Sequence, residues 1–195
     1  MKAVVPDALL LAAGESVRMG QHKALLIFDE RNTFLEQCLE VFDAFGCENI
    51  IVVMNESLKV ETSELQLKMP VNSILCVNPK PSDGRFSSIL TGLQQLKCNK
   101  PLFIHNVDSP FVSMNVLEQL SSSLKESDYA VPVYEDMGGH PLLVSARLAR
   151  ILKNEKDITI NLKSFLKEFQ KQTISVTDRK VLANINDKKN YLKWF

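Results

Sequence analysis

The chain has 195 residues, 45% of them hydrophobic, and a formal net charge of zero. A domain of this length buries roughly 70% of the surface of its unfolded chain, so a single hydrophobic core is expected. The 23 basic and 23 acidic side chains are scattered along the sequence, which argues against a surface for nucleic acid or anionic lipid. No apolar stretch approaches the ~18 residues that a membrane span needs, and a cytoplasmic protein is predicted.

Two further features argue against a signal peptide and against a cysteine-histidine metal site. The apolar N-terminal run is interrupted by Pro6 and Asp7, which favours a first strand over a signal peptide. The four cysteines stand far apart, without a C-x-x-C pair or a histidine at metal-ligand spacing. Reduced thiols in a core are therefore predicted.

Strand and helix patterns alternate through the first two thirds of the chain. Short apolar runs rich in β-branched residues predict strands over 8–13, 49–54, 73–77 and 101–107. Apolar side chains at i, i+3 and i+4 predict helices over 33–45, with Gly46 as C-cap, over 85–96, and over 114–124 after Ser113 as N-cap. Such alternation is typical of a parallel sheet reached by right-handed crossovers.

The last third is less regular. Candidate strands 129–134 and 140–145 flank a predicted turn at Gly138 and Gly139, helical patterns follow from Ala146 and over 162–169, and apolar segments lie at 173–177 and 181–186. We predict an antiparallel excursion that returns to the same sheet. No repeat or linker marks a second domain, so residues 1–195 are predicted to form one three-layer α/β/α domain with a doubly wound, mostly parallel sheet.

A glycine-containing loop, "LLAAGESVRMGQHKALL" (10–26), follows the first predicted strand. In open α/β sheets ligands bind beyond the carboxyl ends of the strands, and this loop is the usual phosphate cradle. Gly14 and Gly20 let backbone amides approach phosphate oxygens, and Arg18 and Lys23 add two cations. The spacing matches neither G-x-x-x-x-G-K-[ST] nor G-x-G-x-x-G, which excludes a Walker ATPase and a Rossmann dehydrogenase.

These residues resemble the signature L-A-A-G-x-S-x-R-M-G-x-x-K-x-L of the MobA-like nucleotidyltransferases, which include molybdenum cofactor cytidylyltransferases and guanylyltransferases. Four later segments are similar to further motifs of that family: "NPKPSDGRFSSILTGL", "VDSPFV", "GGHPLLV" and "NIN". Together the similar segments reach from residue 9 to residue 186. The resemblance implies a nucleotide-diphospho-sugar transferase-like fold and transfer of a nucleoside monophosphate from an NTP to a phosphorylated acceptor, with release of pyrophosphate.

The chemistry of that reaction agrees with the residues present. Attack at an α-phosphorus builds negative charge on phosphate oxygens, so positioned cations and Mg²⁺ matter more than covalent partners. A phosphate acceptor is largely ionised at neutral pH and needs no strong general base, so the lack of a Ser/His/Asp set is no objection.

The resemblance also implies roles for individual residues. It implies catalytic roles for Lys23, Arg18 and Asp108, metal binding by Asp108 and Asn186, and acceptor binding by His140. His22 and His105 are interpreted as structural residues. The residues expected at the nucleotide are Leu11, Ala12, Ala13, Gly14, Arg18, Lys23, Gly84, Ser88 and Gly92.

The sequence departs from the family pattern at three places, which concern the backbone geometry of the site and the recognition of the acceptor. Val107 replaces the usual glycine before the aspartate, and its β-branch restricts the backbone. Gly138 replaces the arginine before G-H-P, and 154–161 lacks the glycine and arginine of the next family segment. Those lost arginines weaken the case for molybdopterin as acceptor.

The sequence leaves alternatives for both the nucleotide and the acceptor. Ala13 completes the L-A-A-G form that the family associates with cytidylyl transfer, which favours CTP over GTP. The acceptor is molybdopterin or, alternatively, a sugar or polyol phosphate, and a molybdoenzyme partner is inferred from the family alone. A non-catalytic nucleotide-binding protein is the alternative of another class.

Overall fold

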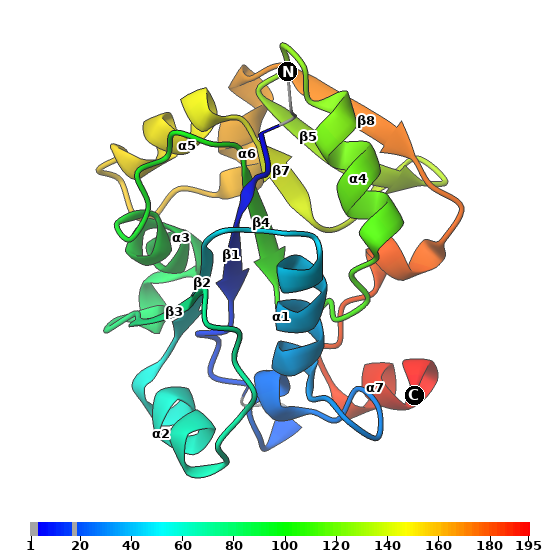
Figure 1. Ribbon diagram of the computed structural model, residues 1–195. Coiled ribbons are helices and arrows are strands. Elements are labelled where there is room, and N and C mark those ends of the chain that lie inside the picture. Colours follow the sequence, from blue (N-terminus) through cyan, green and yellow to red (C-terminus); the bar gives the residue numbers. More distant parts are fainter. Residues whose placement is uncertain (1–3, 17–18) are drawn as a thin grey trace.

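The structure is a computed structural model that describes residues 4–16 and 19–195. The four strands predicted first are confirmed as β1 (Asp7–Leu11), β2 (Ile50–Met54), β3 (Ser73–Val77) and β4 (Leu102–Asn106). They are parallel and lie side by side in the order β3-β2-β1-β4 (Figure 1). Every residue of β1 and β2 is buried, which explains why these strands are continuous apolar runs rather than alternating ones.

The helices predicted between and directly after these strands are present with shorter bounds. They are α1 (Phe34–Ala44), α3 (Arg85–Leu93) and α4 (Met114–Ser123). Thr33 caps α1 in a reciprocal capping box with Glu36, and the Ser113 side chain accepts from the amide of Val116 as predicted. A further helix, α2 (Glu56–Glu64), was not predicted, because it buries only Leu58 and Thr62 and has a weak apolar face.

Helices cover both faces of the sheet, so the predicted three-layer α/β/α arrangement is confirmed (Figure 1). Successive residues of β1 point to opposite faces: Ala8 and Leu10 pack with α1 and α4, whereas Leu9 and Leu11 pack with α3 and with α5 (Ala146–Lys153). The two apolar clusters are therefore separated by the sheet itself.

The second half of the chain makes the predicted antiparallel excursion. The strand β7 (Leu142–Val144) runs antiparallel to β4 and to β5 (Tyr129–Tyr134), and β8 (Lys171–Ser175) returns parallel to β5. The short strand β6 (Met137–Gly138) forms a hairpin with β5.

The hairpin corrects the predicted turn at the glycine pair. Glu135 and Asp136 make the turn, with φ of 47° and 66°. Gly138 instead pairs within the hairpin. Gly139 is buried, and a Cβ there would meet the carbonyl oxygen of Val181 at 2.5 Å, so a close approach of two segments requires glycine.

The C-terminal segments are short. They comprise α6 (Leu162–Phe165), η4 (Leu166–Glu168), η5 (Arg179–Leu182) and α7 (Lys188–Trp194), so part of 181–186 is a 3-10 turn followed by a loop. Over 4–16 and 19–195, no helix is long and apolar enough to cross a membrane.

Candidate functional site

The carboxyl ends of β1 and β4 meet at one edge of the sheet. Leu11 is the register partner of Asn106, and the amide of Val107 donates to the Leu11 carbonyl at 3.1 Å. The glycine loop and Asp108 therefore leave the sheet side by side. A cavity of about 260 Å³ lies between them, and eight of the predicted site residues line it: Leu11, Ala12, Ala13, Gly14, Lys23, Gly84, Ser88 and Asp108.

Three predicted residues from distant parts of the chain converge at this cavity. The Lys23 ammonium donates to Asp108 Oδ2 at 3.1 Å and to Asn186 Oδ1 at 2.7 Å. Lys23 begins the short helix η2 (Lys23–Leu25), Asp108 follows β4, and Asn186 precedes α7. The amide of Ile185 donates to the Asp108 carbonyl at 2.7 Å, which holds the C-terminal segment beside the strand end.

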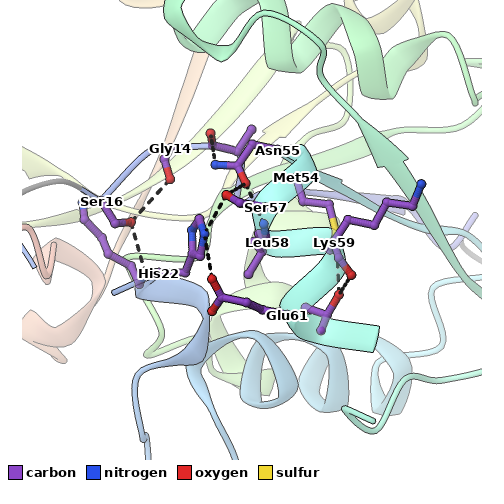
Figure 2. Close-up of polar contacts among 12 residues, drawn as sticks. Gly14, Ser16, His22, Met54, Asn55, Ser57, Leu58, Lys59 and Glu61 are labelled. Atoms are coloured by element: carbon purple, nitrogen blue, oxygen red, sulfur yellow. Dashed lines mark hydrogen bonds and ion pairs between the residues drawn. The ribbon is translucent and has the colours of Figure 1, made fainter. Parts of the chain in front are cut away.

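The glycine loop is fastened to its surroundings by side-chain hydrogen bonds (Figure 2). Ser16 Oγ accepts from the amide of Lys23 at 3.1 Å. The buried Asn55 side chain caps α2 and donates to the Ala13 carbonyl at 3.3 Å. Asn55 is a positioning residue that the sequence analysis missed, and its signal was an N-cap asparagine directly after a buried strand. Arg18 lies outside the described residues.

His22 ties the same loop to α2, as Figure 2 shows. Its Nε2 lies 3.0 Å from Ser57 Oγ and 3.4 Å from Glu61 Oε1. Both contacts use the same ring nitrogen, whereas a Ser/His/acid relay uses the two nitrogens separately. His22 therefore holds the loop against α2 and is not part of a nucleophilic triad.

The second family-like segment forms the opposite wall of the cavity. The Asn78 amide donates to Ser87 Oγ at 2.8 Å and to Ser88 Oγ at 3.0 Å, so the asparagine holds the start of α3. Gly84, the N-cap of α3, has a φ of 96°, which only glycine adopts without strain. The backbone is thus turned so that α3 begins at the cavity.

Three predicted contacts lie outside this lining. Asn186 is connected to it through the Lys23 ammonium. Gly92 is buried on α3 against β1 and β2, where a Cβ would approach Val53 Cγ2 to 2.8 Å and Leu9 still more closely. Its role in the structure is to allow close helix–sheet packing. His140 is mostly covered, with its ring 6.1 Å from that of His105.

Both of these histidines are held in the neutral form at pH 7. Burial, with smaller contributions from the neighbouring His140 and Arg85, lowers the pKa of His105 to about 3, although the hydrogen bond to the Ser109 carbonyl acts in the opposite direction. Burial and Arg85 likewise lower the pKa of His140 to about 4. Neither histidine supplies positive charge at pH 7, so positive charge near the cavity comes from lysine and arginine.

Arg85 is a cation of the cavity that the sequence analysis did not identify. It is the first residue of α3 and immediately follows Gly84. The helix N-terminus adds partial positive charge at the same place. The available signal was its position inside the "DGRFSSI" segment, next to the glycine that the resemblance places at the nucleotide.

The valine that replaces the family glycine does not distort the site. Val107 is 5% exposed and belongs to the apolar cluster beneath α1. Its backbone is not among the positive-φ residues of the described chain, so a β-branched side chain fits there without strain.

The donor set suits a hard divalent ion that is shared with phosphate. Asp108 Oδ1 is buried and has no hydrogen-bond partner among the described residues. Asp108 Oδ2 and the side-chain oxygen of Asn186 both accept from the Lys23 ammonium. Mg²⁺ is bound by one or two protein oxygens together with phosphates and water. Within 4–16 and 19–195, no group of three or more His, Cys, Asp or Glu side chains forms an all-protein metal site.

The doubly wound sheet and the cavity at its carboxyl edge define an α/β protein whose cavity lies where open α/β sheets bind ligands. A family model for the MobA-like NTP transferase domain matches residues 8–173. The chain belongs to the MobA-like NTP transferase family, and the resemblance of its motifs is confirmed.

Two curated relatives carry molybdenum cofactor names. A probable molybdenum cofactor guanylyltransferase of Methanosarcina mazei is 32% identical over 138 residues, which cover 70% of this chain and 61% of that protein. The molybdenum cofactor cytidylyltransferase of Escherichia coli strain K12 is 27% identical over 141 residues, covering 71% and 69%. The chain thus spans less than two thirds of the length of the first relative.

Solved structures show the same fold. The crystal structure of Rv0371c from Mycobacterium tuberculosis H37Rv has a TM-score of 0.82 at 18% identity, covering 100% of this chain and 98% of that chain. A structure of Rv0371c in complex with manganese has a TM-score of 0.77 at 17% identity, covering 99% and 98%.

Proposed function

We propose that this protein is a Mg²⁺-dependent enzyme that transfers a nucleoside monophosphate from an NTP to the phosphate of a small acceptor and releases pyrophosphate. The observation that carries the proposal is the convergence of Lys23, Asp108 and Asn186 beside the glycine loop. A cation, a carboxylate and an amide oxygen beside a cavity of about 260 Å³ fit phosphoryl chemistry, which depends on positioning and charge.

The chain's residues have separable roles in this reaction. An acceptor phosphate oxygen forms a bond to the α-phosphorus while the bond to the β-phosphate bridging oxygen breaks, and the electron pair leaves with pyrophosphate. The amides of the glycine loop and the ammonium of Lys23 bind the triphosphate oxygens as charge moves onto the leaving group. Arg18 is proposed as a second phosphate ligand from its place in the motif.

Asp108 and Asn186 would hold the divalent ion. When bound, the ion neutralises charge on the phosphates of the nucleotide. Support comes from the unpartnered Asp108 Oδ1 and from the manganese complex of the related Rv0371c. In this structure the Lys23 ammonium donates to Asp108 Oδ2 and to Asn186 Oδ1. When the nucleotide binds, we expect the ammonium to donate to phosphate oxygens instead.

The choice of CTP and of a molybdopterin-like acceptor belongs to the same proposal. Ala13 and Gly14 give the L-A-A-G form of the cytidylyltransferases that the chain resembles. Molybdopterin as acceptor is supported by the molybdenum cofactor names of the two relatives, whereas a molybdoenzyme partner is proposed from the family resemblance alone. Location in the cytosol stays a prediction.

The test is pyrophosphate release from CTP, GTP, ATP and UTP with Mg²⁺, with molybdopterin or sugar phosphates as acceptor. Asp108→Ala should lower release by at least a hundredfold, whereas Asp43→Asn, a change at an exposed position of α1, should leave it unchanged. Release with a sugar phosphate alone would overturn molybdopterin as acceptor and retain the reaction. Nucleotide binding without release from any pair would overturn the enzymatic proposal.

A further inference from the structure

The strand β3 forms one edge of the sheet, at the end far from β7 and β5 (Figure 1). Within the described residues it pairs with β2 alone. Ile74 is 40% exposed and Leu75 is 41% exposed, and these neighbours point to opposite faces of the strand. An exposed apolar edge of this kind is a template for pairing with another strand.

The ladder between β2 and β3 decides which backbone groups of β3 are free. The amide of Ile50 donates to the Asn72 carbonyl at 3.0 Å, and the amide of Asn78 donates to the Met54 carbonyl at 2.9 Å. In a parallel ladder alternate residues of a strand bond to the same neighbour. The even-numbered residues of β3 therefore bond to β2, whereas its odd-numbered residues direct their N–H and C=O groups away from the sheet.

The free edge consists of Ser73, Leu75 and Val77. The Ser73 amide donates to the Pro70 carbonyl at 3.0 Å, so only the carbonyl of Ser73 is available. Leu75 and Val77 present both of their backbone groups. When two such strands pair antiparallel about Leu75, the two copies of Leu75 exchange two hydrogen bonds, and each Val77 amide donates to the Ser73 carbonyl of the other copy. The free groups of this edge are thus complementary to themselves.

The charge of the edge also suits a second copy. Residues 69–78, "MPVNSILCVN", contain no charged side chain. In an antiparallel pair about Leu75 each residue of 72–78 faces another residue of 72–78, so a charge in this segment would approach its own copy. The other end of the sheet is protected against such pairing, because β6 has only two residues and β8 begins with the exposed Lys171.

We propose that two copies of this chain pair antiparallel through β3, with a two-fold axis at Leu75, so that their sheets become continuous. This inference concerns assembly and does not depend on the proposed reaction. A pair of five-residue strands buries less than the roughly 1,200 Å² of a standard interface. The dimer is therefore expected to be weak, with a dissociation constant between about 10 µM and about 1 mM.

Sedimentation equilibrium of the full chain across that concentration range tests the dimer. The average mass should rise from that of one chain toward that of two. Leu75→Lys places two ammonium groups opposite each other and should weaken association by at least about tenfold. Leu192→Lys, the same change at an exposed position of α7, is the matched control and should associate as the parent does. The mass of one chain at every concentration, or a loss of association in Leu192→Lys alone, would overturn the proposal.

A disulfide tests the register. In a chain that carries Cys76→Ser, Leu75→Cys places two thiols on paired strands with Cα atoms about 5.5 Å apart, within the range of a disulfide. The three other cysteines are buried. Mild oxidation should therefore cross-link two chains. Val71→Cys in the same background is the control for random collision, because its two copies lie about 26 Å apart in this register. Equal rates of cross-linking for the two variants would overturn the pairing about Leu75.

Discussion

Lys23 is the residue on which the site geometry depends most. It contributes its amide to Ser16 and its ammonium to Asp108 and Asn186, with its side chain only 16% exposed. The same lysine therefore holds the glycine loop in place and neutralises a partly buried carboxylate. This double role makes its charge more important than that of the exposed lysines on the surface.

We expect Lys23→Met to weaken binding of CTP with Mg²⁺ by about tenfold to a hundredfold, because charge-assisted hydrogen bonds to phosphate are lost. Isothermal titration calorimetry measures the change. Lys59→Met, at an exposed position of α2 that pairs with Glu56 at 3.8 Å, is the matched control and should bind CTP as the parent does. Equal affinities of both variants would contradict a role of Lys23 at the triphosphate.

At the scale of elements, the approach of α3 to the sheet sets the position of the cavity wall. Gly92 has no side chain between the helix and β1, so α3 packs directly on Leu9 and Val53. Ser88 and Arg85, one and two turns earlier on α3, are thereby brought to the cavity at the carboxyl edge of the sheet.

Gly92→Ala should lower the free energy of unfolding by about 1–3 kcal/mol, since the added methyl group overpacks a buried contact. Urea denaturation followed by circular dichroism gives this value. Gly138→Ala places a methyl group in open space and should change stability by less than about 0.5 kcal/mol. A neutral Gly92→Ala variant would show that α3 can move away from β1 without cost.

At the scale of the whole molecule, the C-terminal helix joins segments that are remote in sequence. The Tyr191 hydroxyl donates to the carbonyl of Ile27 at 2.8 Å, and Phe195 stacks on Phe111 with ring centroids 5.4 Å apart. These contacts place α7 against the loops after η2 and β4. Asn186, just before α7, is held beside Lys23 as a result.

Two histidines, the buried His105 and the mostly covered His140, link global stability to pH. Folding lowers the pKa values of His105 and His140 from 6.5 to about 3 and about 4, so the unfolded chain binds more protons as the pH falls. Their contribution to stability is complete above pH 6.5 and is lost progressively as the pH falls toward about 4. The free energy of unfolding should decrease by up to about 1.4 kcal/mol per pH unit for each histidine.

Urea denaturation at pH 7, 6 and 5 measures this slope. His105→Gln keeps a polar side chain that cannot titrate and should remove roughly half of the decrease. His22→Gln, on the loop outside this pair, is the matched control. An unchanged slope in a variant that carries both His105→Gln and His140→Gln would assign the pH dependence to other groups.

Much of the fold and site could be predicted from local sequence because each signal is local. The four apolar runs predicted β1 to β4, and the glycine motif and "VDSP" predicted Lys23 and Asp108 at the cavity. The helix α2 was missed because its apolar face is weak, and Arg85 and Asn55 were missed because a single arginine or asparagine carries no spacing pattern.

Local sequence was enough to predict β1 to β4, the helices α1, α3 and α4 and the residues of the glycine loop, because hydrophobic periodicity and short motifs act over a few neighbouring residues. The shared ammonium between Asp108 and Asn186 is visible only in the folded chain, since 85 and 163 positions separate these residues from Lys23. Folding also packs Gly92 against β1 and β2 and brings Arg85 to the cavity that Asp108 lines. Such contacts depend on how elements remote in sequence pack together, and no local pattern of residues encodes that packing.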